Sequence, residues 1–237
     1  TTLYSILKFV DSPEKNIVTV EDPVEYQLEG INQVTAKPEI GLTFANALRS
    51  ILRQDPNIIM IGEIRDCDTA DIAIKSALTG HLVLSTLHTT TASGAIVRLI
   101  NMGVEPYLIN SSLLCVVAQR LLRKVCNNCK EKYVIKKEIL DNSKFNTEGM
   151  EKFEFFRGKG CPECLNTGYS GRAGIAEVLL SSQAIRELVL SRKQEHAIKE
   201  QACKEGMKTL REDGLRVAKE GITSLEEVIR ATEADEL

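Results

Sequence analysis

The first ninety residues hold three short apolar runs. They cover residues 17–20, 58–61 and 82–84 and are rich in Ile, Val and Leu. The first is a β-branched run that includes Thr19, whereas residues 58–61 are apolar without interruption, as is typical of a strand that is covered on both faces of its sheet. The sequence therefore predicts at least three buried strands in this part of the chain.

Apolar residues recur at helical spacing before and between these runs. The spacing predicts helices over residues 2–10, over residues 44–52 behind an N-cap at Thr43, and over residues 68–78 with Gly80 at the end. Strands that alternate with helices pair in parallel, because each helix returns the chain to the same end of the sheet. We therefore predict an α/β fold with a helix-covered parallel sheet.

Helical spacing dominates two later stretches of the chain. Residues 92–122 are predicted to form helices, with breaks at Gly103 and Pro106. Residues 182–232 are predicted to form further helices. Three glycines mark the expected breaks of this second stretch: Gly206, Gly214 and Gly221.

The segment between these helical stretches differs in kind. Residues 123–172 carry two Cys-x-x-Cys pairs, many charged residues and several loop signals. We therefore predict three parts: a core over residues 1–122, a cysteine-bearing subdomain over residues 123–172 and a helical region over residues 173–237.

Composition excludes several classes of protein. The 237 residues are 43% hydrophobic and 27% charged, which is ordinary for a globular protein. A net charge of −3 argues against general nucleic-acid binding. No apolar run approaches the roughly 20 residues that span a bilayer, and no leader pattern is seen. Four of the seven cysteines lie in Cys-x-x-Cys pairs, which indicates metal binding in a reducing, cytosolic compartment.

The two cysteine pairs predict a metal site. Cys126 and Cys129 are separated by 31 residues from Cys161 and Cys164. Four thiolates suit a tetrahedral, structural Zn²⁺ site, because no open position remains for catalysis. Disulfide pairing is the alternative. The remaining cysteines lie in helical patterns, and we expect them to be small buried hydrophobic residues: Cys67, Cys115 and Cys203.

Acidic residues follow two of the predicted strands. Glu21, Asp22 and Glu25 come after the first, and Glu63 comes after the second. The carboxyl ends of parallel strands meet at one edge of the sheet, where ligands bind in this class of fold. Two carboxylates there could hold hydrated Mg²⁺ and orient a water for attack on a γ-phosphate. The alternative is that these acids only cap loops.

Arginines and histidines accompany the acids. Arg49, Arg53 and Arg65 could offset phosphate charge within one subunit or across a subunit boundary, and ion pairs with the same acids are the alternative. His81 and His88 flank the third strand. Since no Cys or carboxylate lies at ligand spacing from them, we expect hydrogen-bonding roles rather than metal binding.

Several strings together resemble one family. They are EDPVEY, LRSILRQDPNIIMIGEIRD, TGHLVLSTLHTTTA, CNNC, CPEC, GYSGRAGI and LREDGLRVAKEGITSLEEV. In this order, along nearly the whole chain, they resemble the secretion ATPase superfamily, specifically the type II secretion and type IV pilus assembly ATPases. The resemblance implies a RecA-like fold that binds ATP and Mg²⁺, with Zn²⁺ held by the four cysteines.

The resemblance also implies roles for single residues. Glu25 would be the catalytic glutamate that polarises water, and Glu63 would organise the Mg²⁺ shell. His81 and His88 would sense the nucleotide. The family works as a homohexamer that is cytoplasmic and peripheral to the inner membrane. There it drives an inner-membrane platform protein that extrudes pilin or pseudopilin subunits.

One motif of the family is absent from the sequence. The phosphate-binding pattern G-x-x-x-x-G-K-[ST] does not occur, whereas family members carry it immediately before a TTLYS-like string. The resemblance therefore places Thr1 and Thr2 beside the nucleotide. We expect truncation of a longer chain, and little ATP hydrolysis by this chain alone. A degenerate, non-catalytic zinc-bearing assembly or binding protein is the rival interpretation.

The start of the cysteine segment is strongly basic. Residues 120–137 hold seven Lys or Arg and one acid, a local charge of +6. Such a surface could bind acidic loops of a membrane platform, anionic lipid or nucleic acid, and a merely solvated face is the default alternative. Nucleic-acid binding would need stacking aromatics. Since we expect Phe153, Phe155 and Phe156 to pack in a core, no nucleic acid is expected as a partner.

Overall fold

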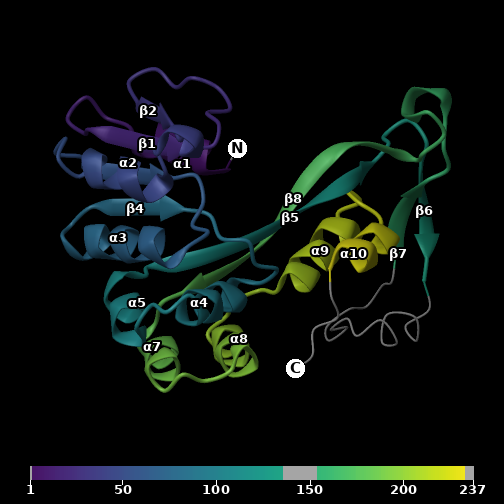
Figure 1. Ribbon diagram of the computed structural model, residues 1–237. Coiled ribbons are helices and arrows are strands. Elements are labelled where there is room, and N and C mark those ends of the chain that lie inside the picture. Colours follow the sequence, from purple (N-terminus) through teal and green to yellow (C-terminus); the bar gives the residue numbers. More distant parts are fainter. Residues whose placement is uncertain (1, 136–153, 233–237) are drawn as a thin grey trace. The chain divides into compact units, whose positions relative to one another are not determined.

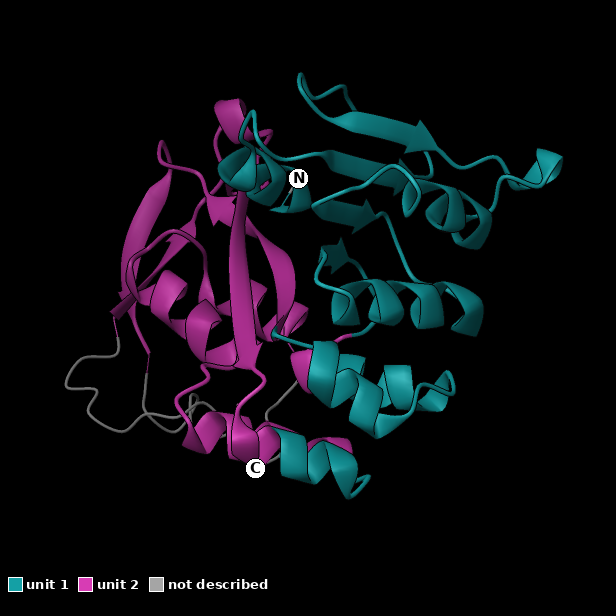
Figure 2. Ribbon diagram, turned by 90° about the vertical axis from the view of Figure 1, so that its left-hand side faces the viewer, with its two compact units in different colours: residues 1–89, 94–114, 186–193 teal, residues 90–93, 115–185, 194–237 magenta. Residues whose placement is uncertain are grey.

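The chain forms two compact units (Figure 2). The structure is a computed structural model that describes residues 2–135 and 154–232. The first unit comprises residues 1–89, 94–114 and 186–193, and the second comprises residues 90–93, 115–185 and 194–237. No helix of the described residues has both the length and the apolar character that a membrane span requires.

The first unit contains a four-stranded parallel sheet (Figure 1). Its strand order is β2 (Asn32–Thr35), β1 (Ile17–Glu21), β3 (Ile58–Ile61) and β4 (Leu82–Ser85). The strands predicted from apolar runs are β1, β3 and β4, and the predicted α/β class is confirmed. Strands β1 and β3 are buried as predicted, whereas β4 is half-buried. The sequence prediction missed β2, since its four residues NQVT hold a single apolar side chain.

Helices cover both faces of this sheet. On one face, Tyr4 and Leu7 of α1 (Thr2–Val10) pack with Met60 of β3. Alternate strand residues point to the opposite face. There α2 (Phe44–Ile51) contacts β1, and α3 (Cys67–Leu78) contacts β4. These three helices match the predicted ones.

Helices α2 and α3 each start at a residue whose side chain accepts from one of the free backbone N–H groups of the first turn. The Thr43 side chain accepts from the N–H of Asn46 at the start of α2, as predicted. The Asp66 carboxylate does the same for Thr69 at the start of α3. The remaining elements of this part of the chain are the 3₁₀ helix η1 (Pro38–Ile40), α4 (Ala92–Asn101) and α5 (Pro106–Ser112).

The predicted helix up to Leu122 is wrong beyond Ser112. The chain instead forms β5 (Cys115–Val125), which pairs antiparallel with β8 (Tyr169–Leu180). Leu113, Val117 and Leu121 recur every four residues and imitate helical spacing. Long-range pairing with β8 overrides this local pattern. Strand β5 crosses the predicted boundary at residue 122, and β8 crosses the one at residue 172. The three-part division stays a prediction.

The second unit adds a short hairpin and a set of helices. Strand β6 (Lys130–Val134) pairs antiparallel with β7 (Glu154–Gly158). The predicted helices of the last stretch are present. The remaining elements of the second unit are η2 (Pro162–Cys164), α8 (Glu195–Lys204), α9 (Leu210–Lys219) and α10 (Leu225–Ala231). Helix α7 (Gln183–Leu190) starts in the second unit, and its residues from Arg186 on belong to the first.

Glycines of this stretch have two different functions. Gly206 and Gly221 follow helix ends with φ of 99° and 72°, a conformation that favours glycine. Gly214 instead lies inside α9, so the predicted break there is wrong. A Cβ at Gly214 would come within 2.6 Å of Cγ1 of Val228, so glycine allows α9 and α10 to pack closely.

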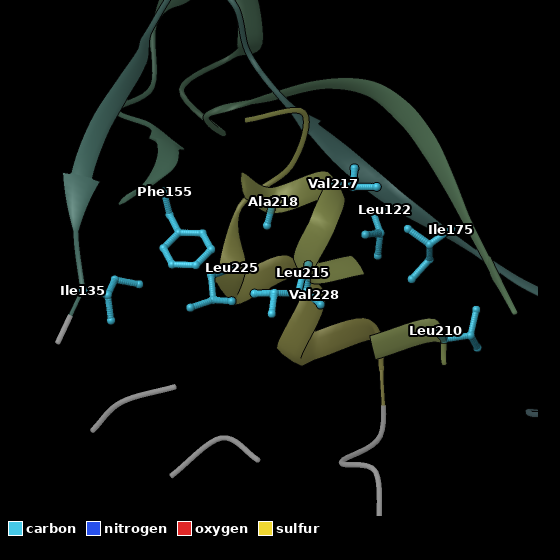
Figure 3. Packing of buried hydrophobic residues seen from close by; sticks show 10 residues of the cluster. All are labelled: Leu122, Ile135, Phe155, Ile175, Leu210, Leu215, Val217, Ala218, Leu225 and Val228. Atoms are coloured by element: carbon cyan, nitrogen blue, oxygen red, sulfur yellow. The ribbon is translucent and has the colours of Figure 1, made fainter. Parts of the chain in front are cut away.

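Aliphatic and aromatic side chains form the core of the second unit (Figure 3). Phe155 is fully buried, as the sequence analysis expects, and Phe156 is half-buried. Phe153 lies outside the described residues. Most of the other side chains of this core come from β5, β8, α9 and α10, namely Leu122, Ile175, Leu210, Leu215, Val217, Ala218, Leu225 and Val228.

A buried carboxylate joins α10 to β5. Glu227 is fully buried and accepts hydrogen bonds from Nη2 of Arg123 at 2.7 Å and Nη2 of Arg230 at 2.7 Å. Burial alone would raise the pKa of Glu227, but hydrogen bonds from Arg230 and Arg123 outweigh it and lower the pKa to about 2. The charged form is therefore the one that the fold stabilises.

Replacing Glu227 tests this contribution. Because Glu227→Gln leaves two guanidinium groups without their counter-charge, it should lower the free energy of unfolding by roughly 3 kcal/mol at neutral pH. A group with a depressed pKa stabilises the fold above its ordinary pKa of 4.5 and loses this effect as pH falls toward about 2. The gap between wild type and Glu227→Gln should therefore shrink below about pH 4.5 in urea unfolding. Glu220→Gln, which removes only an exposed ion pair with Arg216, is the control.

Gly62, directly after β3, tests the packing of the sheet. A Cβ at Gly62 would lie 3.3 Å from both Cα of Glu21 and the carbonyl oxygen of Val20. Since both atoms are backbone of a central strand, Gly62→Ala should destabilise the protein by about 1–3 kcal/mol in urea unfolding. Gly174→Ala, where nothing lies within 4 Å, should change stability little. Equal effects of the two substitutions would contradict this account.

Candidate functional site

The parallel sheet brings three loops together at one edge. We call this the carboxyl edge: residues 21–25 after β1, 62–66 after β3 and 86–88 after β4. The N–H of Gly62 donates to the carbonyl of Val20 at 2.7 Å, and the N–H of Ile64 donates to the carbonyl of Thr86 at 3.0 Å. The Thr86 hydroxyl donates to the carbonyl of Gly62 at 2.7 Å. The three loops are thus hydrogen-bonded side by side.

Glu63 is the centre of a charged cluster at this edge. It forms an ion pair with Arg65, and its Oε2 lies 2.7 Å from Nε2 of His88. Arg65 chiefly, and His88 in addition, hold the pKa of Glu63 below its ordinary value. Glu63 chiefly, and the charge of Asp22 in addition, raise the pKa of Arg65. The acids of β1 and β3 therefore converge, as the sequence predicts.

The acids after β1 divide into a buried one and exposed ones. Glu21 is 4% exposed and accepts hydrogen bonds from neighbouring side chains. Glu25 is exposed, and its carboxylate makes no hydrogen bond or ion pair with any described residue. The sequence predicts Glu21 as an equal member of the acidic cluster after the strand. Glu21 is instead the last residue of β1, whose five residues are all buried.

The two histidines lie at opposite ends of β4. His88 follows the strand at the carboxyl edge, whereas His81 precedes it. The His81 Nδ1 lies 2.8 Å from the carbonyl of Ser76 and 3.1 Å from the hydroxyl of Thr79. Both histidines therefore make the hydrogen bonds expected of them. Only His88 is part of the charged cluster, and β4 separates it from His81.

The three candidate arginines lie in different places in the fold. Of the three candidates, only Arg65 lies in the charged cluster. Arg53 stands beside Gln54, whose carbonyl accepts from Nδ2 of Asn16 at 2.7 Å, directly before β1. Arg53 therefore lies at the amino end of the sheet. The Arg49 guanidinium donates to Oδ1 of Asn46 on its own helix.

Thr2 begins α1, and Thr1 lies outside the described residues. The nucleotide-binding roles predicted for these two threonines, and for Arg49, Arg53 and His81, stay predictions.

The four paired cysteines form a tight cluster in the second unit. Their sulfur atoms all lie within 4.8 Å of one another. Cys126 to Cys161 and Cys129 to Cys164 are each 3.9 Å, and Cys161 to Cys164 is 3.7 Å. Four sulfurs about 2.3 Å from a tetrahedral Zn²⁺ are about 3.8 Å apart, which matches these distances. All four cysteines are free thiols, so the disulfide alternative is not realised.

Backbone N–H groups surround this cluster. Burial alone would raise the pKa of Cys164, but the N–H groups of Cys161 and Gly168, each 3.2 Å from its sulfur, contribute to lowering it. Gly160 donates to Sγ of Cys129 at 3.3 Å. Donors of this kind stabilise the thiolates that metal binding requires.

The other cysteines and the basic residues differ from expectation. Cys67 and Cys115 are exposed and Cys203 is half-buried, so the prediction of three buried cysteines is wrong. Part of the predicted basic surface is neutralised, because Arg123 pairs with Glu227 and Lys132 with Glu154. Lys130 lies 4.3 Å from the centre of the Phe156 ring. Lys136 and Lys137 lie outside the described residues.

Comparison with known proteins identifies the relatives of this chain. Residues 1–230 match the family model described as type II/IV secretion system protein. The chain is 50% identical to the type II secretion system ATPase E of Vibrio cholerae over 232 residues, which are 98% of this chain and 46% of that protein. It is 51% identical to the type IV pilus assembly ATPase PilB of Thermus thermophilus over 231 residues, which are 98% of this chain and 26% of that protein.

A solved structure has a similar fold. The crystal structure of the pilus retraction motor PilT with bound ADP superposes with a TM-score of 0.68 and 27% identity, covering 100% of this chain and 58% of that one. The chain spans less than half the length of each of the two relatives. The family model matches residues 1–230, and both relatives align with 98% of the chain. The chain therefore belongs to the type II/IV secretion system protein family, together with ATPases of type II secretion and type IV pilus assembly.

Proposed function

We propose that this chain is the part of an ATP-hydrolysing motor that activates water, in a machine for type II secretion or type IV pilus assembly. The observation that carries the proposal is the cluster of Glu63, Arg65 and His88 beside the acidic loop of β1. Ligands of parallel α/β sheets bind at this edge. The named activities of the relatives support the same reaction.

The residues of the carboxyl edge suit different parts of this reaction. The Glu25 side chain is exposed and its carboxylate has no partner among the described residues, so it can accept a proton from an attacking water. Arg65 can offset charge on the phosphates. Glu63 is held ionised by Arg65 and His88, and through His88 it links the loop of β4 to the loop of β3.

The residues present also fit a magnesium ion. Mg²⁺ retains several waters and binds to proteins through one or two carboxylates. Each oxygen of Glu63 already has a partner, Oε1 in Arg65 and Oε2 in His88, so Glu63 suits a magnesium-bound water better than the bare cation. Bound Mg²⁺ would supply charge neutralisation at the phosphates.

The test joins this chain to the part of the Vibrio cholerae relative that precedes its matching region, where the family resemblance places the phosphate loop. We call this the joined protein. Glu25→Gln should lower its kcat for ATP hydrolysis by about 100-fold or more at unchanged nucleotide affinity, because only proton acceptance is lost. Glu63→Gln should lower kcat by at least about tenfold. Phosphate release and binding of a fluorescent nucleotide measure the two quantities.

Glu29→Gln is the matched control, since Glu29 is an exposed acid in the same loop region and should leave kcat unchanged. Full turnover by Glu25→Gln would refute the role of Glu25. A joined protein that binds no nucleotide would favour the rival function, a non-catalytic zinc-bearing assembly or binding protein.

We further infer that the four-cysteine cluster holds one structural Zn²⁺. The tetrahedral sulfur spacing and the surrounding N–H donors support this. Elemental analysis of protein purified under reducing conditions should find about one zinc per chain. Cys161→Ser should release the metal and unfold the β6–β7 region while the parallel sheet persists, as hydrogen exchange would report. Cys115→Ser, at an exposed cysteine, should retain the metal, and metal-free wild type would contradict the inference.

The partners follow from the same proposal. We propose a homohexamer, because a motor that moves a platform requires closed rotational symmetry. Its proposed partner is the inner-membrane platform protein of the machine, and its proposed location is cytoplasmic and peripheral to that membrane. Nothing in the charge of the described surface calls for nucleic acid, since several of the basic residues near the cysteines are paired with acids.

A further inference from the structure

A network of polar side chains lies beneath the acidic loop of β1. Its centre is the buried carboxylate of Glu21, and its donors are all uncharged. The hydroxyl of Tyr4 donates to Oε2 of Glu21, and the hydroxyl of Thr19 donates to Oε1 at 2.6 Å. Gln33 Nε2 also donates to Oε1, at 3.1 Å. Burying a carboxylate costs folding free energy unless hydrogen bonds compensate for the lost water. The three donors to Glu21 therefore contribute to the stability of this part of the fold.

The Tyr4 hydroxyl is used as donor and as acceptor. Besides donating to Glu21, it accepts from Nε2 of Gln33 at 3.2 Å and from the backbone N–H of Glu25 at 3.3 Å. A phenol offers one donor, and its oxygen accepts the other two bonds. Burial chiefly, and the hydrogen bond to Glu21 in addition, raise the pKa of Tyr4, so the hydroxyl keeps its proton at neutral pH.

The loop after β1 is held at further points by the same side chains. Gln33 Nε2, whose two hydrogens are shared among three acceptors, also lies 3.3 Å from the carbonyl oxygen of Tyr26, and the Gln33 Oε1 accepts from the N–H of Leu28 at 2.7 Å. The rings of Tyr4 and Tyr26 meet edge to face with centroids 4.6 Å apart. Residues 25–28 are therefore fixed from α1 and β2, while the Glu25 side chain itself is exposed.

We propose that Tyr4 is a positioning residue for Glu25: its hydroxyl ties the backbone of Glu25 to the buried Glu21 and thereby fixes where the Glu25 carboxylate stands at the carboxyl edge. This proposal rests on the proposed function for its catalytic meaning. Tyr4 touches no reacting atom and acts through Glu25. The backbone contact distinguishes Tyr4 from Thr19, which supports Glu21 without touching the loop.

Amide hydrogen exchange on this chain tests the contact directly. Tyr4→Phe removes the hydroxyl and keeps the ring, so exchange of the Glu25 amide should become about 5- to 10-fold faster. Tyr26→Phe is the matched control, because the Tyr26 hydroxyl has no hydrogen-bond partner among the described residues. Thr19→Val should destabilise the sheet but leave exchange at Glu25 unchanged. Unchanged exchange in Tyr4→Phe would overturn the proposal.

Kinetics of the joined protein separate positioning from general stability. Tyr4→Phe should lower kcat for ATP by about tenfold with KM unchanged, whereas Thr19→Val and Tyr26→Phe should retain wild-type kcat at a temperature where all are folded. Equal loss of kcat in Tyr4→Phe and Thr19→Val would show a merely structural role and contradict the proposal. A wild-type joined protein that does not hydrolyse ATP would instead contradict the proposed function. The exchange result would still decide whether Tyr4 holds the Glu25 backbone.

Discussion

The site depends on the parallel pairing of β3 between β1 and β4. In this register Val20 pairs with Ile61, and Ile61 pairs with Ser85, so all three strands end at one edge. Main-chain hydrogen bonds that start at Gly62 and Ile64 continue the ladder into the loops. A slip of one residue would turn every side chain of a strand to the other face. Both the core and the position of the acids therefore depend on this register.

The second unit is organised by long-range polar contacts in addition to its core. Arg123 of β5 reaches Glu227 of α10, which lies 104 residues away in the sequence. The cysteine pairs are joined across 35 residues, from Cys126 to Cys161. A contact between such distant segments closes a long loop and therefore restricts the chain somewhat more than a contact between near neighbours does. Loss of the four-cysteine cluster or of the buried carboxylate should therefore affect the second unit rather than the parallel sheet.

The sequence predicts individual helices and strands better than it predicts which strands pair and which distant side chains meet. The apolar run of β3 is visible because all four of its residues are buried, and Cys-x-x-Cys spacing predicts the four cysteines that cluster. Strand β5 is missed because its pairing with β8 is non-local. The sequence also does not show which residues lie at the same end of the sheet. His81 lies at the opposite end from His88, and Arg53 lies at the opposite end from Glu63. The burial of Glu21 depends on Tyr4 and Gln33, which no spacing rule connects to it.

The central claim is that a metal–nucleotide complex binds at the carboxyl edge. It is tested most directly by paramagnetic broadening of isoleucine methyl signals in the joined protein with Mn²⁺ and a non-hydrolysable ATP analogue. Ile64 follows β3 at the carboxyl edge, and Ile58 begins the same strand at the opposite end. The account predicts that the signal of Ile64 broadens and that of Ile58 persists. Broadening of Ile58 to the same or a greater extent would contradict it.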